Sequence, residues 1–448
     1  MKPRVLIISR DSWNNTNNNG NTLSNLFQNW ETDSIANLYC RDEIPDNTVC
    51  THYFKISESD LVNKLLGKKK VAGEIIYKKI DDDSSLHTNF NLKKENTELK
   101  LYDFFRNNRW HMFLWGRELL WKLAEWKSNE LIKFLKDFDP QIIYSQSYDS
   151  FYMHTILHYV QKNTNAKVVY FHCDDLVTYR QYSLSPFYWI NRFLLRKRMN
   201  KSIKAADKNY CIIGEQAKIY KAIYNKKFEL LYKTGNFKEL PIEQKASVPL
   251  KLVYTGNINY GRINSILSIV TALQKINKYE LKAKLYLYTA NLIPPKVRLK
   301  LESSKAVEIM GKVSYNKIPK ILANSDVLIH VESFEKQQML ATSLSFSTKL
   351  VDYFEAAKPI LAIGWEKSAS IKYLKENEIG ITVNSTDEIY KAIYKLLNNP
   401  DSSTLLGIKA REFGLLNHNK NVVLQKFEND LERMICKSNI KEKEKKGY

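Results

Sequence analysis

The residues best suited to chemistry follow one short apolar run, Val327–Val331, which the sequence predicts to be a buried strand. Ser347, Thr348 and Lys349 come just before a stretch, about Leu350 to Ala357, whose pattern predicts a helix. Ser and Thr favour the N-cap of a helix, where free N–H groups and the positive end of the dipole attract anions. Together with the ammonium group of Lys349, this pattern indicates a site for a diphosphate.

Asp352 lies one turn inside the same predicted helix. A carboxylate at that position could accept two hydrogen bonds from a ribose diol. The competing interpretation is an ordinary capped helix with charges on its surface, which is the weaker one because several features coincide.

A second candidate site follows the predicted strand Lys251–Thr255. Gly256, Asn257 and Arg262 lie in the turn that leads from this strand into the next helix. Glycines let the backbone approach a phosphate, and a guanidinium offers a fixed fork of donors. The spacing is not GxGxxG, so a dinucleotide fingerprint is not supported. The alternative is a turn with a surface arginine.

The first half of the chain gives weaker signals. After the predicted strand Arg4–Ser9, a polar loop with Gly20 and Asn21 could bring backbone N–H groups near an anion or a sugar. His172 and Asp174 follow another strand and could orient a hydroxyl group or accept a proton. The alternatives are a plain Asn-rich loop, a core histidine and a capping aspartate.

The elements that must position these residues are short apolar strands with amphipathic helices between them. This alternation predicts an α/β fold with parallel sheets covered on both faces. The pattern breaks near Lys233–Pro249, which predicts two α/β domains; the resemblance described below implies that both are doubly wound and Rossmann-like and that they face a cleft. The predicted strands are Arg4–Ser9, Gln141–Ser145, Lys167–His172, Asn209–Ile213, Lys251–Thr255, Lys284–Tyr288, Val307–Ile309, Val327–Val331, Pro359–Ile363 and Gly380–Val383.

Composition narrows the protein class. The chain has 448 residues, and at about 150 residues per domain this predicts two to three domains. Lys and Arg exceed Asp and Glu by 69 − 48 = 21, which indicates an anionic partner or a compositional bias toward lysine. Five cysteines without a CxxC pair favour a reducing compartment over a disulfide framework or a zinc site. We see no signal peptide and no apolar run of about 18 residues, so we expect a soluble protein or one attached to a membrane surface.

Two stretches are dense in aromatic and basic residues, Arg106–Lys127 and Phe187–Lys204. In the first, Trp110, Trp115, Trp121 and Trp126 alternate with Arg and Lys. Helices of this kind can lie on an anionic bilayer. The alternative is that most of these aromatic side chains belong to the core.

The stretch STKLVDYFEAAKPILAIG (Ser347–Gly364) resembles the donor-site signature of glycosyltransferases with the GT-B fold. It is most similar to the family 4 (glycosyl transferases group 1) enzymes that build bacterial surface polysaccharides. Supporting pieces, in the family's order, are AADKNYCIIGE, YTGNINYGR, VEIMGKVSYNKIPKILANSDVLIHVES and KLLNNPDSSTLLGIKAREFGLLN. The resemblance extends from about Asp207 to Phe427 and is weak before about Asp139.

The resemblance implies a role for each matching position. Asp352, seven residues before Pro359, matches the acid that binds the ribose. Arg262 matches a cation that neutralises the leaving diphosphate. The loop that holds the diphosphate matches Ser347, Thr348 and Lys349; the segment that touches the base matches Ile309, Gly311 and Val313; and the first-domain side chains that face the transferred sugar match His172 and Asp174.

The sequence also departs from the family. A second acid is expected eight residues before Asp352, where Leu344 stands, and either Glu332 or Glu335 could take over its role. Asn257 stands where many members have an arginine. The loop at Gly20 has one glycine where members often have two.

The resemblance implies transfer of a sugar from a nucleotide sugar, UDP by default, with retention of configuration and without a metal or other cofactor. The acceptor would be a saccharide or a polyprenyl-diphosphate-linked saccharide used for cell-surface polysaccharide. We expect a cytoplasmic protein, with the inner face of the cell membrane as an extension of that location. The acidic run Asp81–Asp83 follows no predicted strand, so it is not placed as a metal motif.

The expected domains are residues 1–225 on the acceptor side, with an irregular insertion at about 52–130, and 226–415 for the nucleotide sugar. A helix over 416–436 should return to the first domain, and 437–448 should be a disordered basic tail. Two other function classes stay open. One is a GT-B-like epimerase or a degenerate subunit, suggested by Leu344. The other is a basic nucleic-acid-binding protein, although no zinc finger, RRM or helix-turn-helix signature is present.

Overall fold

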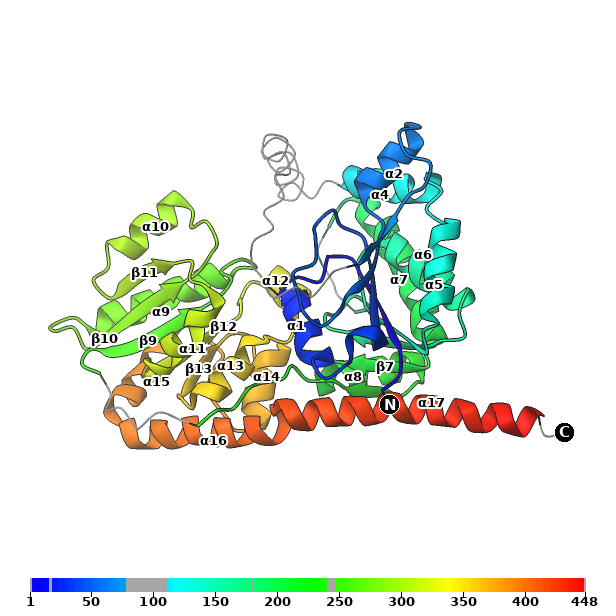
Figure 1. Cartoon of the computed structure of the whole chain (residues 1–448). Helices are drawn as coiled ribbons and strands as arrows, with labels where there is room; N and C mark the ends of the chain where they lie inside the picture. The colour runs from blue at the N-terminus through cyan, green and yellow to red at the C-terminus, as the bar shows by residue number, and fades with distance from the viewer. Residues whose placement is uncertain are drawn as a thin grey trace, which may run out of the picture.

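The computed structural model describes residues 2–15, 18–77, 111–178, 181, 183–239 and 247–446, with the side chains of 18, 111–113 and 437–446 left out. The chain forms two α/β domains side by side, and the C-terminal helices run beneath both of them (Figure 1). The acidic run 81–83 and the first part of the basic–aromatic stretch, with Trp110, lie outside the described residues.

The first domain is built on an eight-stranded sheet with the order β4-β3-β2-β1-β5-β6-β7-β8. Every neighbouring pair is parallel except β3 and β4. The strands are β1 (Val5–Ser9), β2 (Ile35–Tyr39), β3 (His52–Lys55), β4 (Glu74–Tyr77), β5 (Ile142–Gln146), β6 (Lys167–His172), β7 (Lys208–Cys211) and β8 (Phe228–Leu230).

Helices cover both faces of this sheet, which is why its central strands are buried along their whole length. One face packs on α1 and α17, and the other on α4 to α7. The helices of this domain are α1 (Asn18–Phe27), α2 (Glu58–Leu65), α4 (His111–Leu123), α5 (Asn129–Phe138), α6 (Phe151–Lys162), α7 (Pro186–Ala205) and α8 (Gly214–Tyr224).

The second domain has a six-stranded parallel sheet with the order β11-β10-β9-β12-β13-β14. Its strands are β9 (Leu250–Thr255), β10 (Ala283–Tyr288), β11 (Val307–Gly311), β12 (Val327–Val331), β13 (Ile360–Ile363) and β14 (Ile381–Val383). Its helices are α9 (Arg262–Ile276), α10 (Pro295–Glu302), α11 (Ile318–Ala323), α12 (Lys336–Thr342), α13 (Lys349–Ala356), α14 (Ala369–Glu376) and α15 (Glu388–Asn398).

Two helices at the C-terminus join the domains, α16 (Pro400–His418) and α17 (Lys420–Lys446). α16 packs on α13 of the second domain, whereas α17 returns to the first. Phe427 of α17 is fully buried, and its ring meets aromatic rings of α1 and of the first sheet: Phe27, Trp30, Tyr144 and Tyr210. Asp430, one turn further, accepts from Tyr210 Oη at 2.8 Å and pairs with Lys208 at 2.8 Å. The last helix therefore completes the core of the first domain.

All ten predicted strands are present, with ends shifted by at most two residues. Two expected boundaries are corrected. The first domain continues past residue 225, because Phe228–Leu230 pairs with β7 in the first sheet. The tail from Lys437 is helical to Lys446 rather than disordered, in a stretch of good helix formers with no Gly or Pro before Gly447.

Candidate active site

Two helices of the second domain begin at the same edge of its sheet. α9 begins at Arg262, soon after β9, and α13 begins at Lys349. The Lys349 ammonium donates to the carbonyl of Thr255 at 3.2 Å and lies 4.1 Å from the centre of the Tyr254 ring. The N-termini of both helices, with the positive ends of their dipoles, therefore meet at the carboxyl end of β9.

Glu332 follows β12 and supplies the negative charge of this cluster. Its carboxylate is 4% exposed and receives Arg262 Nε at 3.2 Å and Nη2 at 3.0 Å. Burial raises the pKa of Glu332, and the charges of Arg262 and Lys349 oppose that rise. A buried carboxylate held by a guanidinium in this way fixes the direction of the arginine side chain.

The electrostatic feature of this site that matters most for binding an anion is the charge of the Lys349 ammonium. Burial, and after it the charge of Arg262, lowers the pKa of this ammonium to about 7, and the charge of Glu332 opposes the shift. With Lys349 protonated, the two cations exceed the single carboxylate by one positive charge. A diphosphate at the two helix N-termini would balance that excess.

The turn between β9 and α9 requires glycine. Gly261 has φ +74°, and a Cβ atom there would collide with Ser333 Oγ. Gly256 has φ +135°, and its missing side chain leaves the approach to Lys349 open, since a Cβ would lie 3.4 Å from Nζ. The two glycines thus hold the loop close to the cluster while Arg262 is directed at Glu332.

Asp352 is placed near this edge, but its carboxylate is already paired. Lys233 Nζ lies 2.7 Å from Asp352 Oδ1 and donates to the carbonyl of Thr348 at 3.0 Å. Lys233 belongs to the segment that connects the domains, so the ion pair ties this connection to the start of α13. A ribose diol would have to share the carboxylate with Lys233 or displace it.

The loop before α13 differs in one respect from the expected anion cradle. Thr348 occupies the N-cap position, but its side chain makes no capping bond. The backbone N–H of Ser347 donates to Ser370 Oγ at 2.9 Å, so this donor is already used. Ser347 was expected to offer its amide, and that expectation is corrected because α14 approaches the loop closely.

The strand expected to touch the base ends beside the same edge. Ile309 packs partly into the core of the second domain, and Gly311 O accepts from Thr289 N at 3.0 Å. Val313 is half-buried just beyond. Tyr315, two residues later, has a pKa raised mainly by burial and then by the Asp352 carboxylate, whereas a hydrogen bond to the Asn21 side chain opposes the rise. Asn21 belongs to α1, so the first domain reaches the site here.

His172 does not face the cleft, which corrects the expectation for this residue. Val168, Tyr170 and His172 share the face of β6 that packs on the core, and the imidazole is fully buried among Tyr170, Tyr220 and Phe228. Burial lowers the pKa of His172 to about 4, and Nε2 lies 3.3 Å from Asn209 Oδ1. It is a neutral core histidine.

Asp174, in contrast, is exposed beyond the end of β6. Its pKa is raised first by partial desolvation and then by the carboxylates of Asp175 and Asp149. Asp149 follows β5 and pairs with Arg10, which follows β1, at 3.0 Å. The carboxyl edge of the first sheet therefore presents an aspartate with a raised pKa near Asp149, whose carboxylate is paired with Arg10.

The remaining candidates have structural surroundings. Gly20 lies inside the first turn of α1, where a Cβ atom would collide with the backbone of Asn14. Asn257 Oδ1 accepts from the N–H of Asn259 at 2.6 Å within the turn. Glu335 is exposed and accepts from Asn264 Nδ2 at 2.5 Å, and Leu344 is buried at 7% exposure. Glu335 is thus occupied by α9, whereas Glu332 is the carboxylate that belongs to the cluster.

Four site residues were not predicted from the sequence: Lys233, His330, Arg10 and Asp149. His330 is fully buried, its Nε2 lies 3.4 Å from Glu332 Oε1, and burial holds its pKa well below the usual range. A lysine in a linker and a histidine inside an apolar strand carry no spacing signal. Arg10 and Asp149, however, directly follow predicted strands, and the strand-end rule could have found them.

Residues 249–399 match the family model described as "Glycosyl transferases group 1". The second domain is a glycosyltransferase domain. The match spans β9 to the end of α15 and contains Arg262, Glu332, Lys349 and Asp352. A search of curated protein sequences finds no match to the chain.

Solved structures resemble the whole chain. HepE from Anabaena, solved in complex with UDP, is 10% identical, covers 97% of this chain and 100% of its own, and has a TM-score of 0.59. Sucrose-phosphate synthase from Thermosynechococcus elongatus is 12% identical over 97% and 100% of the two chains, with a TM-score of 0.58. At these identities the likeness establishes the GT-B fold.

The chain spans 58% of the length of S. aureus TarM, a structure that covers 67% of this chain at 12% identity and a TM-score of 0.49. Among the described residues, no helix is long and apolar enough to cross a membrane. Within the same part of the chain, no group of three or more His, Cys, Asp and Glu side chains is arranged to hold a metal ion.

Proposed function

We propose that the protein transfers a sugar from a UDP-sugar to a saccharide or lipid-linked saccharide, in the synthesis of a cell-surface polysaccharide. The transfer retains the configuration of the sugar and needs neither a metal ion nor another cofactor. The enzyme we propose is a member of family 4 of the GT-B glycosyltransferases, which the signature Ser347–Gly364 supports. UDP as the nucleotide is supported by HepE, whose structures hold UDP and UDP-glucose.

The observation that carries this proposal is the charge cluster at the edge of the second sheet. Arg262 and Lys349 stand at the N-termini of α9 and α13 with Glu332 between them. Negative charge grows on the diphosphate as the glycosidic bond breaks, so fixed cations and helix N–H groups stabilise the transition state more than the ground state. Removing one such donor typically costs about 2.7–4 kcal/mol of transition-state stabilisation.

The acceptor binds at the carboxyl edge of the first sheet, opposite the donor. Asp174 is the exposed carboxylate there, and its raised pKa suits a group that accepts a hydrogen bond or a proton from the attacking hydroxyl. Arg10, held by Asp149, supplies a positive charge at the same edge. Asp174 takes the role in our proposal that the buried His172 cannot take.

The donor half of the proposal is tested by thermal shift with UDP, UDP-sugars and other nucleotides. We expect UDP compounds to stabilise the wild type by about 2.7 kcal/mol at 100 times the dissociation constant. Lys349→Met should abolish most of this shift, whereas Lys391→Met, a change at an exposed lysine of α15, should preserve it. The absence of a shift with every nucleotide would remove the donor site.

The catalytic half is tested by UDP release in the presence and absence of saccharide acceptors. We expect release that depends on the acceptor and is unchanged by a chelator such as EDTA. Asp174→Asn should lower kcat while leaving the UDP shift intact. Nucleotide binding without any acceptor-dependent release would instead favour an epimerase or a subunit without transfer activity.

A further inference from the structure

The first domain exposes a run of large apolar side chains at the start of α7. Phe187, Trp189, Ile190 and Phe193 are 57%, 52%, 46% and 67% exposed, and Leu184, just before the helix, is fully exposed. Spacings of three and four residues place Trp189, Ile190 and Phe193 on one stripe of the helix. Tyr188 points the other way, into the protein.

A second exposed group lies at the end of α2. Val62, Leu65 and Leu66 are 42%, 52% and 62% exposed, and the chain continues through Gly67 into three exposed lysines, 68–70. On the neighbouring helix α4, Leu119 and Leu123 are also more than half exposed. α4 packs between α2 and α6, and α6 packs on α7, so the exposed side chains belong to adjacent helices.

The tryptophan residues of the first basic–aromatic stretch divide between two environments. Trp121 and Trp126 are buried in the core, where Trp121 stacks on Tyr152. For these two residues the structure therefore supports the alternative given above, that such aromatic side chains belong to the core. Trp115 is 38% exposed and belongs to the outer side of α4. The exposed apolar surface thus comes chiefly from α7 and α2.

The charges around these side chains are mainly positive, and the acidic side chains of α2 and α4 are paired: Glu58 and Glu118 with Arg117, Asp60 with Lys69, and Glu125 with Lys64. α7 contains no acidic residue, and six basic residues follow the aromatic stripe along the helix: Arg192, Arg196, Lys197, Arg198, Lys201 and Lys204. At the end of α2, the lysines 68–70 directly follow the exposed leucines. Apolar tips with lysines and arginines beside them match the boundary of an anionic bilayer, where acyl chains lie beneath negative headgroups.

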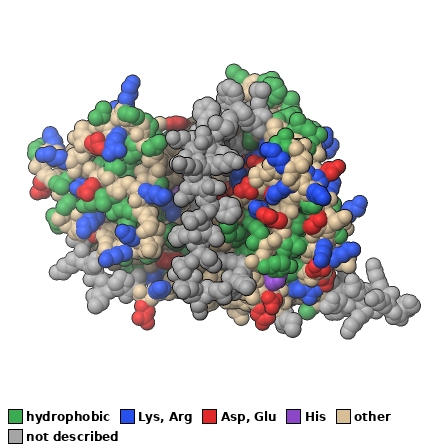
Figure 2. Space-filling view, turned by 45° about the horizontal axis from the view of Figure 1, so that its top comes forward, with side chains coloured by type: hydrophobic (Ala, Val, Ile, Leu, Met, Phe, Trp, Pro, Cys, Tyr) green, Lys and Arg blue, Asp and Glu red, His purple; other side chains and the backbone are tan. Residues whose placement is uncertain are grey.

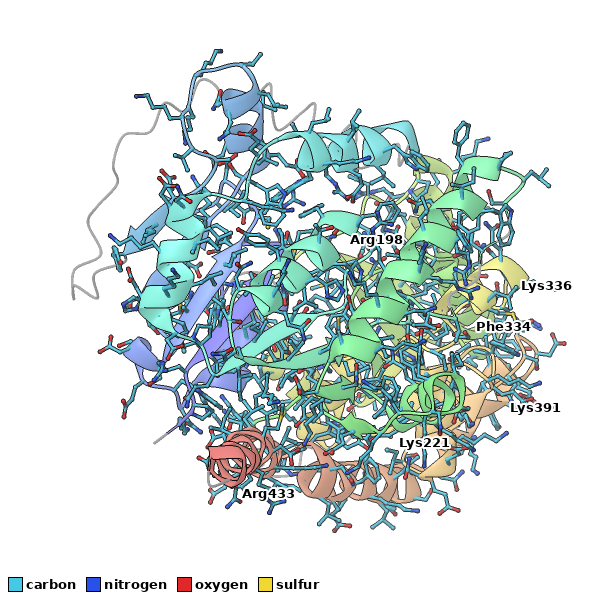
Figure 3. The ribbon with its side chains drawn as sticks, turned by 90° about the vertical axis from the view of Figure 1, so that its right-hand side faces the viewer. Arg198, Lys221, Phe334, Lys336, Lys391 and Arg433 are labelled. Carbon is cyan, nitrogen blue, oxygen red and sulfur yellow. The ribbon has the colours of Figure 1, made fainter. Side chains whose placement is uncertain are left out.

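The figures place these helices on one side of the molecule. In Figure 1, α2 and α4 lie at the top of the first domain and α17 at the bottom. Figure 3 shows α7 running from the level of α4 downward, with Arg198 along its length and Arg433 of α17 at the opposite end. In Figure 2, hydrophobic side chains on the right-hand domain lie among both basic and acidic ones.

We propose that the outer sides of α2, α4 and the start of α7 form a docking face for an anionic phospholipid bilayer. None of the described helices can cross a bilayer, so the attachment is interfacial.

The docking face is connected to the acceptor edge of the first sheet. Arg196 Nε of α7 donates to the carbonyl of Val177 at 2.9 Å, in the segment that follows Asp174. An interfacial orientation would therefore hold the acceptor edge next to the headgroups, where a lipid-linked saccharide resides. This last step rests on the proposed function, whereas the bilayer contact does not.

The experiment is a flotation assay of the full chain with two kinds of vesicle, phosphatidylcholine alone and phosphatidylcholine mixed with phosphatidylglycerol. We expect at least tenfold more protein to float with the anionic vesicles. The apolar variant combines Phe187→Ser, Trp189→Ser and Phe193→Ser, and the charge variant combines Lys68→Glu and Lys70→Glu. Lys69 is left unchanged because its ammonium pairs with the buried Asp60.

The matched controls remove an apolar and two basic side chains from the opposite side of the molecule. Leu405→Ser changes a leucine of α16 that is 66% exposed, and Lys391→Glu with Lys395→Glu changes exposed lysines of α15. We expect both test variants to lose at least tenfold in flotation and both controls to retain it. Far-UV circular dichroism and the thermal shift with UDP verify the fold and the donor site separately.

Three outcomes would overturn the proposal. The wild type could fail to float with anionic vesicles, the apolar variant could float as well as the wild type, or the control variants could lose as much as the test variants. If the protein floats but binds no nucleotide, the docking face stands and the proposed function fails. If it binds UDP but does not float, the proposed function stands and the docking face fails.

Discussion

Lys349 concentrates the chemistry of the donor site in one ammonium group. Its neighbours are the Thr255 carbonyl, the face of the Tyr254 ring and the Arg262–Glu332 pair, with Gly256 leaving one side open. Because burial lowers the pKa to about 7, the charge of this lysine depends on what occupies the site. An incoming diphosphate favours the charged form and raises the pKa again.

This gives a pH dependence for the binding of a UDP-sugar. Below about pH 7 the free enzyme already carries the proton, so affinity should be constant. Above pH 7 binding must take up a proton, and affinity should fall by up to about tenfold per pH unit. Isothermal titration calorimetry across pH 6 to 9 measures the dissociation constant, and buffers of different ionisation enthalpy report the proton uptake.

Lys349→Arg serves as the control for this pH profile, because arginine keeps its charge throughout the range. The profile of this variant should be flat. A dissociation constant of the wild-type protein that stays the same from pH 6 to 9 would show that Lys349 is fully protonated in the free enzyme.

The residue scale also shows where sequence patterns mislead. The strand-end rule selected both His172 and Asp174, yet His172 is buried inside the domain and Asp174 lies on its surface. His172 is the last residue of β6 and occupies the alternating position that faces the core, whereas Asp174 lies beyond the strand. One residue of difference in where a strand ends decides between a core side chain and a site residue.

At the scale of elements, the turn before α9 is fixed by Gly261. The residue has φ +74°, and any side chain would meet Ser333. Gly67 at the end of α2 has φ +70° with nothing within 4 Å of its virtual Cβ. A side chain at either position would be held in a strained left-handed backbone conformation. Only at position 261 would it also collide with a neighbouring side chain.

We expect Gly67→Ala to lower the free energy of unfolding by about 1–2 kcal/mol, the cost of a left-handed conformation for alanine. Gly261→Ala should cost more and should also weaken UDP binding, since Arg262 follows directly. Urea unfolding and thermal shift with UDP measure the two effects. Equal stability losses without a change in UDP binding would contradict the role given to the turn.

α17 offers a second test at this scale. Phe427 is fully buried against the first domain, whereas Val422 on the same helix is 54% exposed. Phe427→Ala should lower the free energy of unfolding by about 3–5 kcal/mol. Val422→Ala should change it by less than about 0.5 kcal/mol. Guanidinium denaturation compares them, and similar values for both would mean that α17 contributes little to the first domain.

The sequence predicted strands where β-branched and apolar residues form a run, as in β1, β6 and β12. It missed β2, β3, β4 and β8, which are short or interrupted by polar residues; β8 is only Phe228–Leu230. Such strands owe their structure to pairing with neighbours rather than to their own pattern. The donor cluster was predicted in part, because Arg262 and Lys349 follow strand ends, but the ion pair of Lys233 with Asp352 depends on contacts between distant segments.

At the scale of the whole molecule, buried histidines make the free energy of unfolding fall as the solution becomes acidic. Burial lowers the pKa of His154, His172 and His418 to about 4, and it also holds the pKa of His330 well below its usual value. In the unfolded chain the same groups titrate near 6.5. Between these values only the unfolded state binds the protons, so stability is full above about pH 6.5 and is lost as pH falls.

Each of these imidazoles should lower the free energy of unfolding by about 1.4 kcal/mol per pH unit within that window. The urea midpoint should therefore drop steeply between pH 6.5 and 4 and stay level from pH 7 to 8. A midpoint that is the same at pH 7 and pH 5 would show that these side chains are already charged in the folded protein.

The two connections between the domains lie side by side. Gly235 N donates to His418 O at 2.8 Å, and Lys420 N donates to Gly235 O at 3.1 Å, so the outgoing and the returning chain run parallel and pair at one point. The returning chain then brings Phe427 into the core of the first domain.

This arrangement sets an order of events during synthesis on the ribosome. The sheet of the first domain is complete in sequence at β8, but the face that receives Phe427 has to wait for roughly 200 more residues. At about 5–20 residues per second, that interval is on the order of 10–40 s. During this time the nascent chain displays an aromatic surface around Phe27 and Tyr210, which makes it a natural client for chaperones that bind apolar segments at the ribosome exit.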